Sequence, residues 1–156
     1  LYSADSIHFA DSLKYYTLRQ HRVVYGGGGI MPDVFVPLDT TQYTKFLRQM
    51  AARSYIINAN LKYIDVNRKQ LKKQFATFND FNARFEVPQS LIDDVVQAAE
   101  KDKIKPKDQQ ELQATLPQLR RQLKALIARD LWDMSEYFQV INETNPIVVK
   151  AVRLLK

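Results

Sequence analysis

The side chains that could carry catalysis are few and scattered along the chain. A serine nucleophile needs a base within hydrogen-bond reach, and the chain has only two histidines, His8 and His21. His21 falls in a predicted hairpin loop, where we expect it to be exposed. No serine sits in a glycine-flanked nucleophile turn; the serines are Ser3, Ser6, Ser12, Ser54, Ser90 and Ser135.

Other pairs of reactive residues are equally poor candidates. A serine–lysine dyad needs a desolvated lysine, whereas the lysines here fall in polar stretches. Asp93 and Asp94 are adjacent on a predicted helix, so their side chains diverge and form no acid/base pair. With no cysteine and no ligand pattern around the histidines, the sequence predicts no catalytic residue, no metal site and no cofactor. The residues alone favour an interaction or scaffolding piece over a self-contained enzyme.

All four glycines lie together, in a run that leads into Ile30, Met31 and Pro32. Glycine permits positive φ and close approach of backbones, and four in succession are costly to order. A phosphate-binding loop needs Gly-Lys-Ser or Gly-Lys-Thr entering a helix, whereas this run enters an extended segment. We therefore predict a tight backbone crossing, and no phosphate site, at Gly26, Gly27, Gly28 and Gly29.

The composition is that of a globular protein, with 156 residues, 46% of them hydrophobic and 26% charged. No apolar run approaches the roughly 20 residues needed to span a bilayer. No secretory signal opens the chain, and because it does not begin with methionine we interpret it as a fragment of a longer polypeptide. The net charge is +6, and the basic residues are spread along the chain with acidic residues between them. This pattern favours solvated helix faces over a nucleic-acid patch.

The pattern predicts a mainly α fold, a helical bundle-like domain preceded by a small β-hairpin/strand arm. Residues 14–18 and 22–25 are rich in β-forming side chains and are separated by a loop of hairpin length. A third extended segment, residues 33–37, is bracketed by prolines. We assign residues 1–38 to the β arm and residues 39–156 to the helical domain.

Helical signals begin at Asp39, Thr40 and Thr41, which offer capping side chains. Apolar residues then recur at helical spacing. An aromatic stripe at spacings of three and four, Phe75 to Phe85, is more typical of a core than of a ligand site. The predicted faces carry Tyr43, Phe46, Leu47 and Met50; Tyr55, Ile56, Ala59, Tyr63, Val66 and Leu71; Phe75, Phe78, Phe81 and Phe85; and, after Pro88, Leu91, Val95 and Ala99.

Capping signals also divide the C-terminal half. Asp108 and Glu111 have capping-box spacing, and we expect a short helix that breaks near Thr115. The longest helix follows, and Asn145-Pro146 starts the last helix, which carries Ile147, Val148, Ala151, Val152 and Leu155. The longest helix is predicted to carry one face made of Leu116, Leu119, Leu123, Leu126, Ile127, Leu131, Met134, Phe138 and Ile141.

Residues 22–33 closely resemble a segment of the carboxyl-terminal processing (tail-specific) serine peptidases. In that family an arginine, a glycine turn and a Pro-Asp pair close the protease core sheet after the catalytic residues. Residues 123–132 resemble the helical C-terminal extension of Bacteroidetes-type members, so the resemblance covers nearly the whole chain. The matching structural motif consists of Arg22, Tyr25, Gly26, Gly27, Gly28, Gly29, Ile30, Pro32 and Asp33.

The resemblance implies a parent endopeptidase of the periplasm or cell envelope that cuts proteins near their C-termini with a serine–lysine dyad. The Ser-rich nucleophile stretch, the Phe-Gly-Lys-Gly-like stretch of the base and the PDZ domain are not in this chain, so no catalytic residue carries over. We therefore expect this chain to be inactive alone and to give structural or regulatory support. Its implied partners are the parent's protease core and PDZ domain, and the parent's protein substrates.

Two further expectations concern partners. Exposed Val23, Val34 and Val36 would make the β arm an edge for pairing with a second copy of the chain. The alternative function is a basic helical protein- or nucleic-acid-binding module, although no nucleic acid is expected as a partner. Retention on heparin across a salt series separates this basic binding module from the peptidase domain, because binding to a polyanion is steeply salt-dependent.

Overall fold

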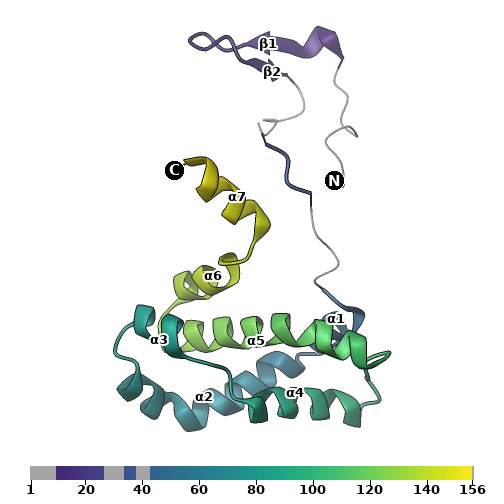
Figure 1. Cartoon of the computed structure of the whole chain (residues 1–156), viewed down its shortest axis with the longest axis vertical. Helices are drawn as coiled ribbons and strands as arrows, with labels where there is room; N and C mark the ends of the chain where they lie inside the picture. The colour runs from purple at the N-terminus through teal and green to yellow at the C-terminus, as the bar shows by residue number, and fades with distance from the viewer. Residues whose placement is uncertain (1–9, 27–33, 38–42, 156) are drawn as a thin grey trace. The chain divides into compact units, whose positions relative to one another are not determined.

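The computed structural model describes residues 10–26, 34–37 and 43–155 (Figure 1). The chain divides into two units, Leu1–Asp39 and Thr40–Lys156. It is mainly helical, with a two-stranded antiparallel sheet before the helices, which confirms the predicted fold class. Some predicted features lie outside the described residues: Gly27, Gly28, Gly29, Ile30, Pro32 and Asp33 of the glycine motif, and the capping candidates Asp39, Thr40 and Thr41.

In the first unit, β1 (Lys14–Tyr16) and β2 (Val23–Tyr25) form the predicted antiparallel hairpin. The Thr17 amide donates to the Arg22 carbonyl at 3.0 Å, and the Thr17 hydroxyl accepts from the Arg22 amide at 3.0 Å. These two bonds close the loop between the strands. Every residue of the two strands except Tyr25 is exposed, so the hairpin has no buried face of its own among the described residues.

The third extended segment does not become a strand. Its described part, residues 34–37, is neither helical nor paired with β1 or β2, so the prediction of a third strand is wrong for these residues. Pro37 has no N–H to donate to a ladder, which disfavours sheet pairing. Val34 is exposed as expected, whereas Val36 is half-buried, which corrects its predicted place on an open edge.

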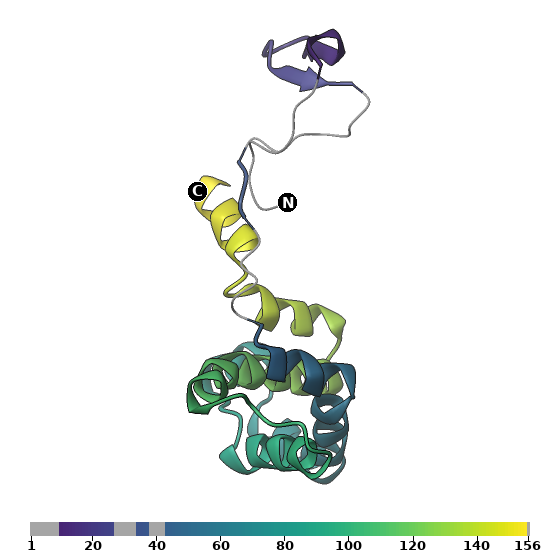
Figure 2. The same cartoon turned by 90° about the vertical axis from the view of Figure 1, so that its right-hand side faces the viewer.

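In the second unit, seven helices make up most of residues 43–155. The longest, α5, contacts α1, α2 and α6, and α2 also contacts α1 and α4 (Figures 1 and 2). The helices are α1 (Lys45–Ala52), α2 (Tyr55–Gln74), α3 (Phe78–Arg84), α4 (Gln89–Lys101), α5 (Gln109–Leu131), α6 (Met134–Asn142) and α7 (Pro146–Leu155).

The predicted faces of α1 and α4 are confirmed apart from Tyr43, which is 51% exposed. The cap of α1 is Thr44, whose hydroxyl accepts from the Leu47 amide at 3.2 Å and satisfies one of the free N–H groups of the first turn. The α4 helix begins directly after Pro88, as expected. The buried residues of these two faces are Phe46, Leu47, Met50, Leu91, Val95 and Ala99.

The aromatic stripe belongs to the core, as predicted. Phe81 is fully buried, and its ring stacks on Phe85 with 4.5 Å between centroids. Phe75 meets Phe81 edge-on at 5.5 Å, and Trp132 packs against Phe81 at 5.2 Å. Offset and edge-to-face pairs at these separations are favourable beyond the area that they bury. This cluster joins the end of α2, α3 and the end of α5.

The predicted face of α2 is only partly correct. Ile56 and Leu71 are buried, but Val66 is 82% exposed, and the centre of the buried face is Asn60 and Ile64. The core stripe therefore lies one position further along the helix than the stripe of Tyr55, Ala59, Tyr63 and Val66. Those residues lie beside the core and line a groove.

The predicted break near Thr115 is wrong, because α5 runs without interruption from Gln109 to Leu131 with Pro117 inside it. Proline removes one N–H donor from the helix and disfavours its interior position. Buried Thr115 and Leu119 flank it, and the Thr115 hydroxyl bonds to the Glu111 carbonyl at 2.7 Å. Tertiary packing thus outweighs the local signal.

The predicted continuation of the longest helix to Ile141 is also wrong. The chain leaves helical geometry at Trp132, and Asp133 caps α6 by accepting from the Met134 amide at 2.6 Å. As a result Met134 and Phe138 are 47% and 53% exposed and do not extend the α5 face. A short polar cap therefore divides a continuous apolar pattern into two helices.

The last helix, α7, starts where predicted. The Asn145 side-chain oxygen accepts from the Ile147 amide at 3.1 Å, which is the expected cap. No residue of α7 is buried, and Val152 and Leu155 are 46% and 88% exposed. The periodicity thus predicts the helix correctly, but its apolar face does not join the core.

The Glu111 carboxylate ties the start of α5 to the start of α1. Asp108 accepts from the Glu111 amide at 2.8 Å, which confirms the predicted cap. The Glu111 carboxylate accepts from the Lys107 amide at 2.7 Å and from the Phe46 amide at 3.1 Å. These bonds, that of Lys107 first, hold the pKa of Glu111 below its ordinary value of 4.5.

We expect Glu111→Gln to lower the free energy of unfolding by about 1 kcal/mol at pH 7, because the charged acceptor of two backbone N–H groups is lost. A folded pKa below the unfolded one stabilises the fold above the unfolded pKa, and that contribution disappears as pH falls through the folded pKa. The difference between the two proteins in chemical unfolding should therefore shrink as the pH falls below the ordinary pKa of 4.5. Exposed Glu86→Gln is the control, and an equal effect there at pH 7 would contradict this role of Glu111.

Candidate functional site

Three residues of the glycine motif are described, and the structure brings them together at the hairpin. Arg22 immediately precedes β2, Tyr25 ends it and Gly26 follows. The Gly26 amide donates to the Leu13 carbonyl at 2.8 Å. A Cβ built on Gly26 would lie 2.9 Å from the Tyr15 ring, so a larger residue would have to displace that ring. Because the Tyr15 ring is 58% exposed and can move, this contact alone does not require glycine at the first position of the run.

The candidate catalytic residues show no catalytic arrangement in the described parts of the chain. His21 is exposed and has a positive φ of 48°, as suits a hairpin loop. Ser135 donates to its neighbour Glu136 at 2.7 Å, and Asp93 accepts from Gln89 at 2.8 Å. Within residues 10–26, 34–37 and 43–155, no cluster of metal-ligating side chains is found, and none of the helices has the length and apolarity of a membrane span.

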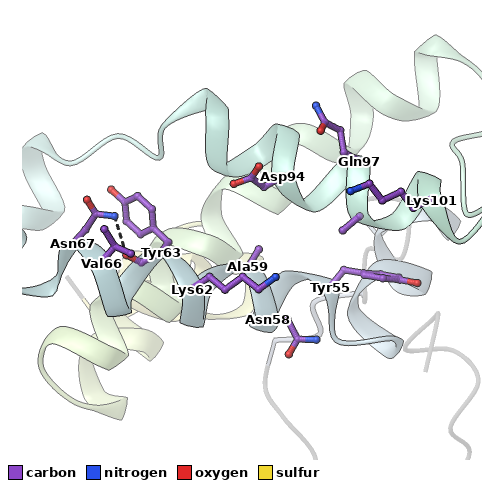
Figure 3. A pocket seen from close by; sticks show the side chains of 11 residues that line it. Tyr55, Asn58, Ala59, Lys62, Tyr63, Val66, Asn67, Asp94, Gln97 and Lys101 are labelled. Carbon is purple, nitrogen blue, oxygen red and sulfur yellow. Dashed lines mark hydrogen bonds between the residues drawn. The ribbon is translucent and has the colours of Figure 1, made fainter.

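The helical unit contains a groove of about 600 Å³ between α2 and α4 (Figure 3). The lining residues of α2 recur at spacings of three and four, as neighbours on one helix face do, and those of α4 recur in the same way from Asp94 to Lys101. Both walls include an alanine at their half-buried base, and these short side chains leave the space between the helices open. The groove is lined by Tyr55, Asn58, Ala59, Lys62, Tyr63, Val66, Asn67, Asp94, Gln97, Ala98 and Lys101.

Charged side chains of both signs line this groove. Lys62 on α2 and Lys101 on α4 both extend toward its middle, and Asp94 lies on the α4 side of the same groove (Figure 3). Neither lysine side chain forms an ion pair or a hydrogen bond with another residue in the described parts of the chain. The groove therefore presents two unpaired ammonium groups from facing helices.

Two tyrosines on α2 flank the lysine pair, and their hydroxyl groups differ in environment. The Tyr55 hydroxyl donates to the Asp102 carboxylate, and this bond is the main reason that the pKa of Tyr55 is raised. Burial raises the pKa of Tyr63. Asn67 donates to the Tyr63 carbonyl at 2.8 Å, which fixes one end of the groove (Figure 3). Both tyrosines therefore remain neutral donors at physiological pH.

A second hollow, of about 570 Å³, adjoins residues 85–87, α5 and α6, but its cations already have partners. Lys124 donates to the Asn82 carbonyl at 2.7 Å, and Arg120 donates to the Val87 carbonyl at 3.3 Å. These bonds hold α3 and the segment after it against α5. The hollow is therefore a structural junction, and the groove between α2 and α4 is the stronger candidate site.

Sequence reasoning did not identify this groove. The periodicity predicts one apolar helix face that includes Tyr55, Ala59, Tyr63 and Val66, and the basic residues in general are expected on solvated helix faces. Lys62 and Lys101 are far apart in the sequence, and only the packing of α2 against α4 brings them to one site. The available signal was the alternation of tyrosine and alanine along a helix face that also carries a lysine.

Residues 46–133, from the first turns of α1 to the cap of α6, match the family model DUF8443, described as a family of unknown function. The match covers more than half of the chain and includes both walls of the groove. The chain belongs to this family. No curated protein and no solved structure shows significant similarity to it.

Proposed function

We propose that this chain is the non-catalytic C-terminal part of a carboxyl-terminal processing serine peptidase, of the Bacteroidetes type. The observation that carries the proposal is the resemblance of residues 22–33 to the segment that closes the protease core sheet in those enzymes. The helical unit would then brace or regulate the protease core. The same resemblance supports a parent in the periplasm or cell envelope, where it would process proteins near their C-termini.

The geometry of the first unit supports this proposal. Two strands of three residues each, with exposed side chains except at Tyr25, are marginal in water without a larger sheet. The strand β2 ends at Tyr25, directly before the glycine run that matches the family motif. Such strands are expected to complete a sheet formed by the parent's protease core, or to pair with a second copy of the chain.

The second unit supports the assignment of a separate domain. Its core joins α1 to α6 and includes the fully buried Leu119, Leu123 and Ile127 of α5. A contiguous core of this kind allows a domain to fold without neighbouring sequence. The helical unit can therefore be removed or exchanged without removing part of another core.

The coding DNA that precedes Leu1 provides the first test. We expect it to encode a Ser-rich nucleophile stretch, a Phe-Gly-Lys-Gly-like lysine stretch and a PDZ-like domain. In the full-length protein, replacing that serine with alanine should abolish cleavage of an unstructured protein substrate. Deleting residues 45–155 should leave the serine able to react with a fluorophosphonate probe, because the dyad lies outside this domain. An upstream sequence that does not encode the serine–lysine dyad would contradict the proposal.

A further inference from the structure

We propose that the groove between α2 and α4 binds an extended acidic peptide segment, with a carboxylate of the peptide held between Lys62 and Lys101. This inference does not rest on the peptidase proposal, because it uses neither the glycine motif nor the β arm. It would survive a finding that the upstream sequence lacks a catalytic dyad.

The groove has the length of a short extended peptide. Its α2 wall runs from Tyr55 to Asn67, which at about 1.5 Å per helical residue is roughly 18 Å. An extended chain rises about 3.3 Å per residue, so about five peptide residues fit along it. Ala59 and Ala98 keep the base of the groove open. The shape suits a strand-like segment better than a compact small molecule.

The charge of the groove selects an acidic ligand. The Lys62 and Lys101 side chains extend toward the middle of the groove from facing helices, with no carboxylate partner among the described residues (Figure 3). Two converging ammonium groups repel each other, and a carboxylate between them replaces that repulsion with two attractive pairs. The lysine pair is therefore the expected position of an acidic side chain.

The rest of the lining favours a peptide over a nucleic acid. The Asp94 carboxylate lies in the same groove and would repel a polyanion, whereas it can accept the backbone N–H groups of a peptide. The Tyr55 and Tyr63 rings offer contact surfaces that lose little conformational entropy on binding. An isolated phosphate would use the lysines but neither the tyrosines nor Asp94.

The test measures binding of a blocked, fluorescein-labelled hexapeptide of alternating glutamate and leucine to the full chain by fluorescence anisotropy. We expect the double variant Lys62→Gln/Lys101→Gln to weaken binding about tenfold, which is what two partly exposed charge pairs supply together. The matched control is Lys69→Gln/Lys72→Gln, which removes the same charge from exposed positions of α2 outside the groove. It should change the Kd less than about twofold.

A second variant tests the location without changing charge. Ala98→Leu fills the groove and should also weaken binding about tenfold, since the peptide loses its space. Equal losses of affinity in the two double lysine variants would mean that the peptide is attracted by net charge alone, and would overturn the proposal. Absence of binding, or unchanged binding in Ala98→Leu, would do the same. So would full competition by inorganic phosphate, because it would define a site for small anions only.

Discussion

Replacing Phe81 with alanine is expected to lower the free energy of unfolding of the helical unit by about 3–5 kcal/mol. The Phe81 side chain is fully buried, and its ring contacts those of Phe75, Phe85 and Trp132. Truncation would leave a cavity at the point where α2, α3 and α5 meet. Rigid rings on three sides cannot collapse into that cavity. The variant therefore loses the transfer free energy of the ring and also bears the free-energy cost of the remaining cavity.

Urea unfolding followed by circular dichroism at 222 nm measures this loss. Phe138→Ala is the matched control, because the Phe138 ring on α6 is 53% exposed and its removal should cost less than about 1 kcal/mol. Trp132 fluorescence reports on the same cluster and should shift in the folded state of the Phe81 variant. Equal destabilisation by the two variants would contradict a central role for the aromatic cluster.

The helices were predictable because helical periodicity and caps are local. The stripe of Phe46, Leu47 and Met50 and the capping pair of Asp108 and Glu111 need no tertiary information. The same local reasoning fails at Pro117. The local sequence predicts that the helix ends there, but burial of Thr115 and Leu119 keeps it continuous. Helix boundaries inside the core therefore depend on packing that the sequence pattern does not contain.

The β arm shows the opposite limit. The hairpin of β1 and β2 was predicted from two short β-forming runs, and the loop closes through hydrogen bonds within a few residues. A third strand needs a neighbour to pair with, and residues 34–37 have none in the described part of the sheet. Local propensity thus predicts a hairpin, but pairing partners decide whether a further extended segment becomes a strand.

The candidate site was the least predictable feature. On α2 the buried stripe contains Asn60, a polar residue, while apolar Val66 is exposed. A search for apolar periodicity therefore shifts the core face by one residue and hides the groove wall within it. The groove also depends on Ala59 and Ala98, whose contribution is the volume that they leave empty. No sequence pattern shows that the helix with Ala59 will pack opposite the helix with Ala98.

The buried Asn60 has its partner on α5. Its side-chain amide donates to the Asp130 carboxylate at 2.6 Å, and its own oxygen is buried without a hydrogen bond in the described parts of the chain. Arg129 donates to the other carboxylate oxygen at 2.9 Å, and Arg68 donates to the Asp130 carbonyl. This cluster links α2 to the end of α5, and only 13% of the Asp130 side chain is exposed.

We expect Asp130→Ala to cost about 3 kcal/mol, because it leaves the Asn60 amide buried with no acceptor and removes the partner of Arg129. The double replacement Asn60→Leu/Asp130→Leu should be less destabilising than the sum of its single replacements by about 1–2 kcal/mol, since it removes the polar groups from both sides. Urea unfolding of the four proteins of this double-mutant cycle gives the coupling free energy. Exposed Asp65→Ala is the control and should cost less than about 0.5 kcal/mol. Strict additivity would mean that Asn60 and Asp130 contribute independently, and the link between α2 and α5 would then rest on apolar packing alone.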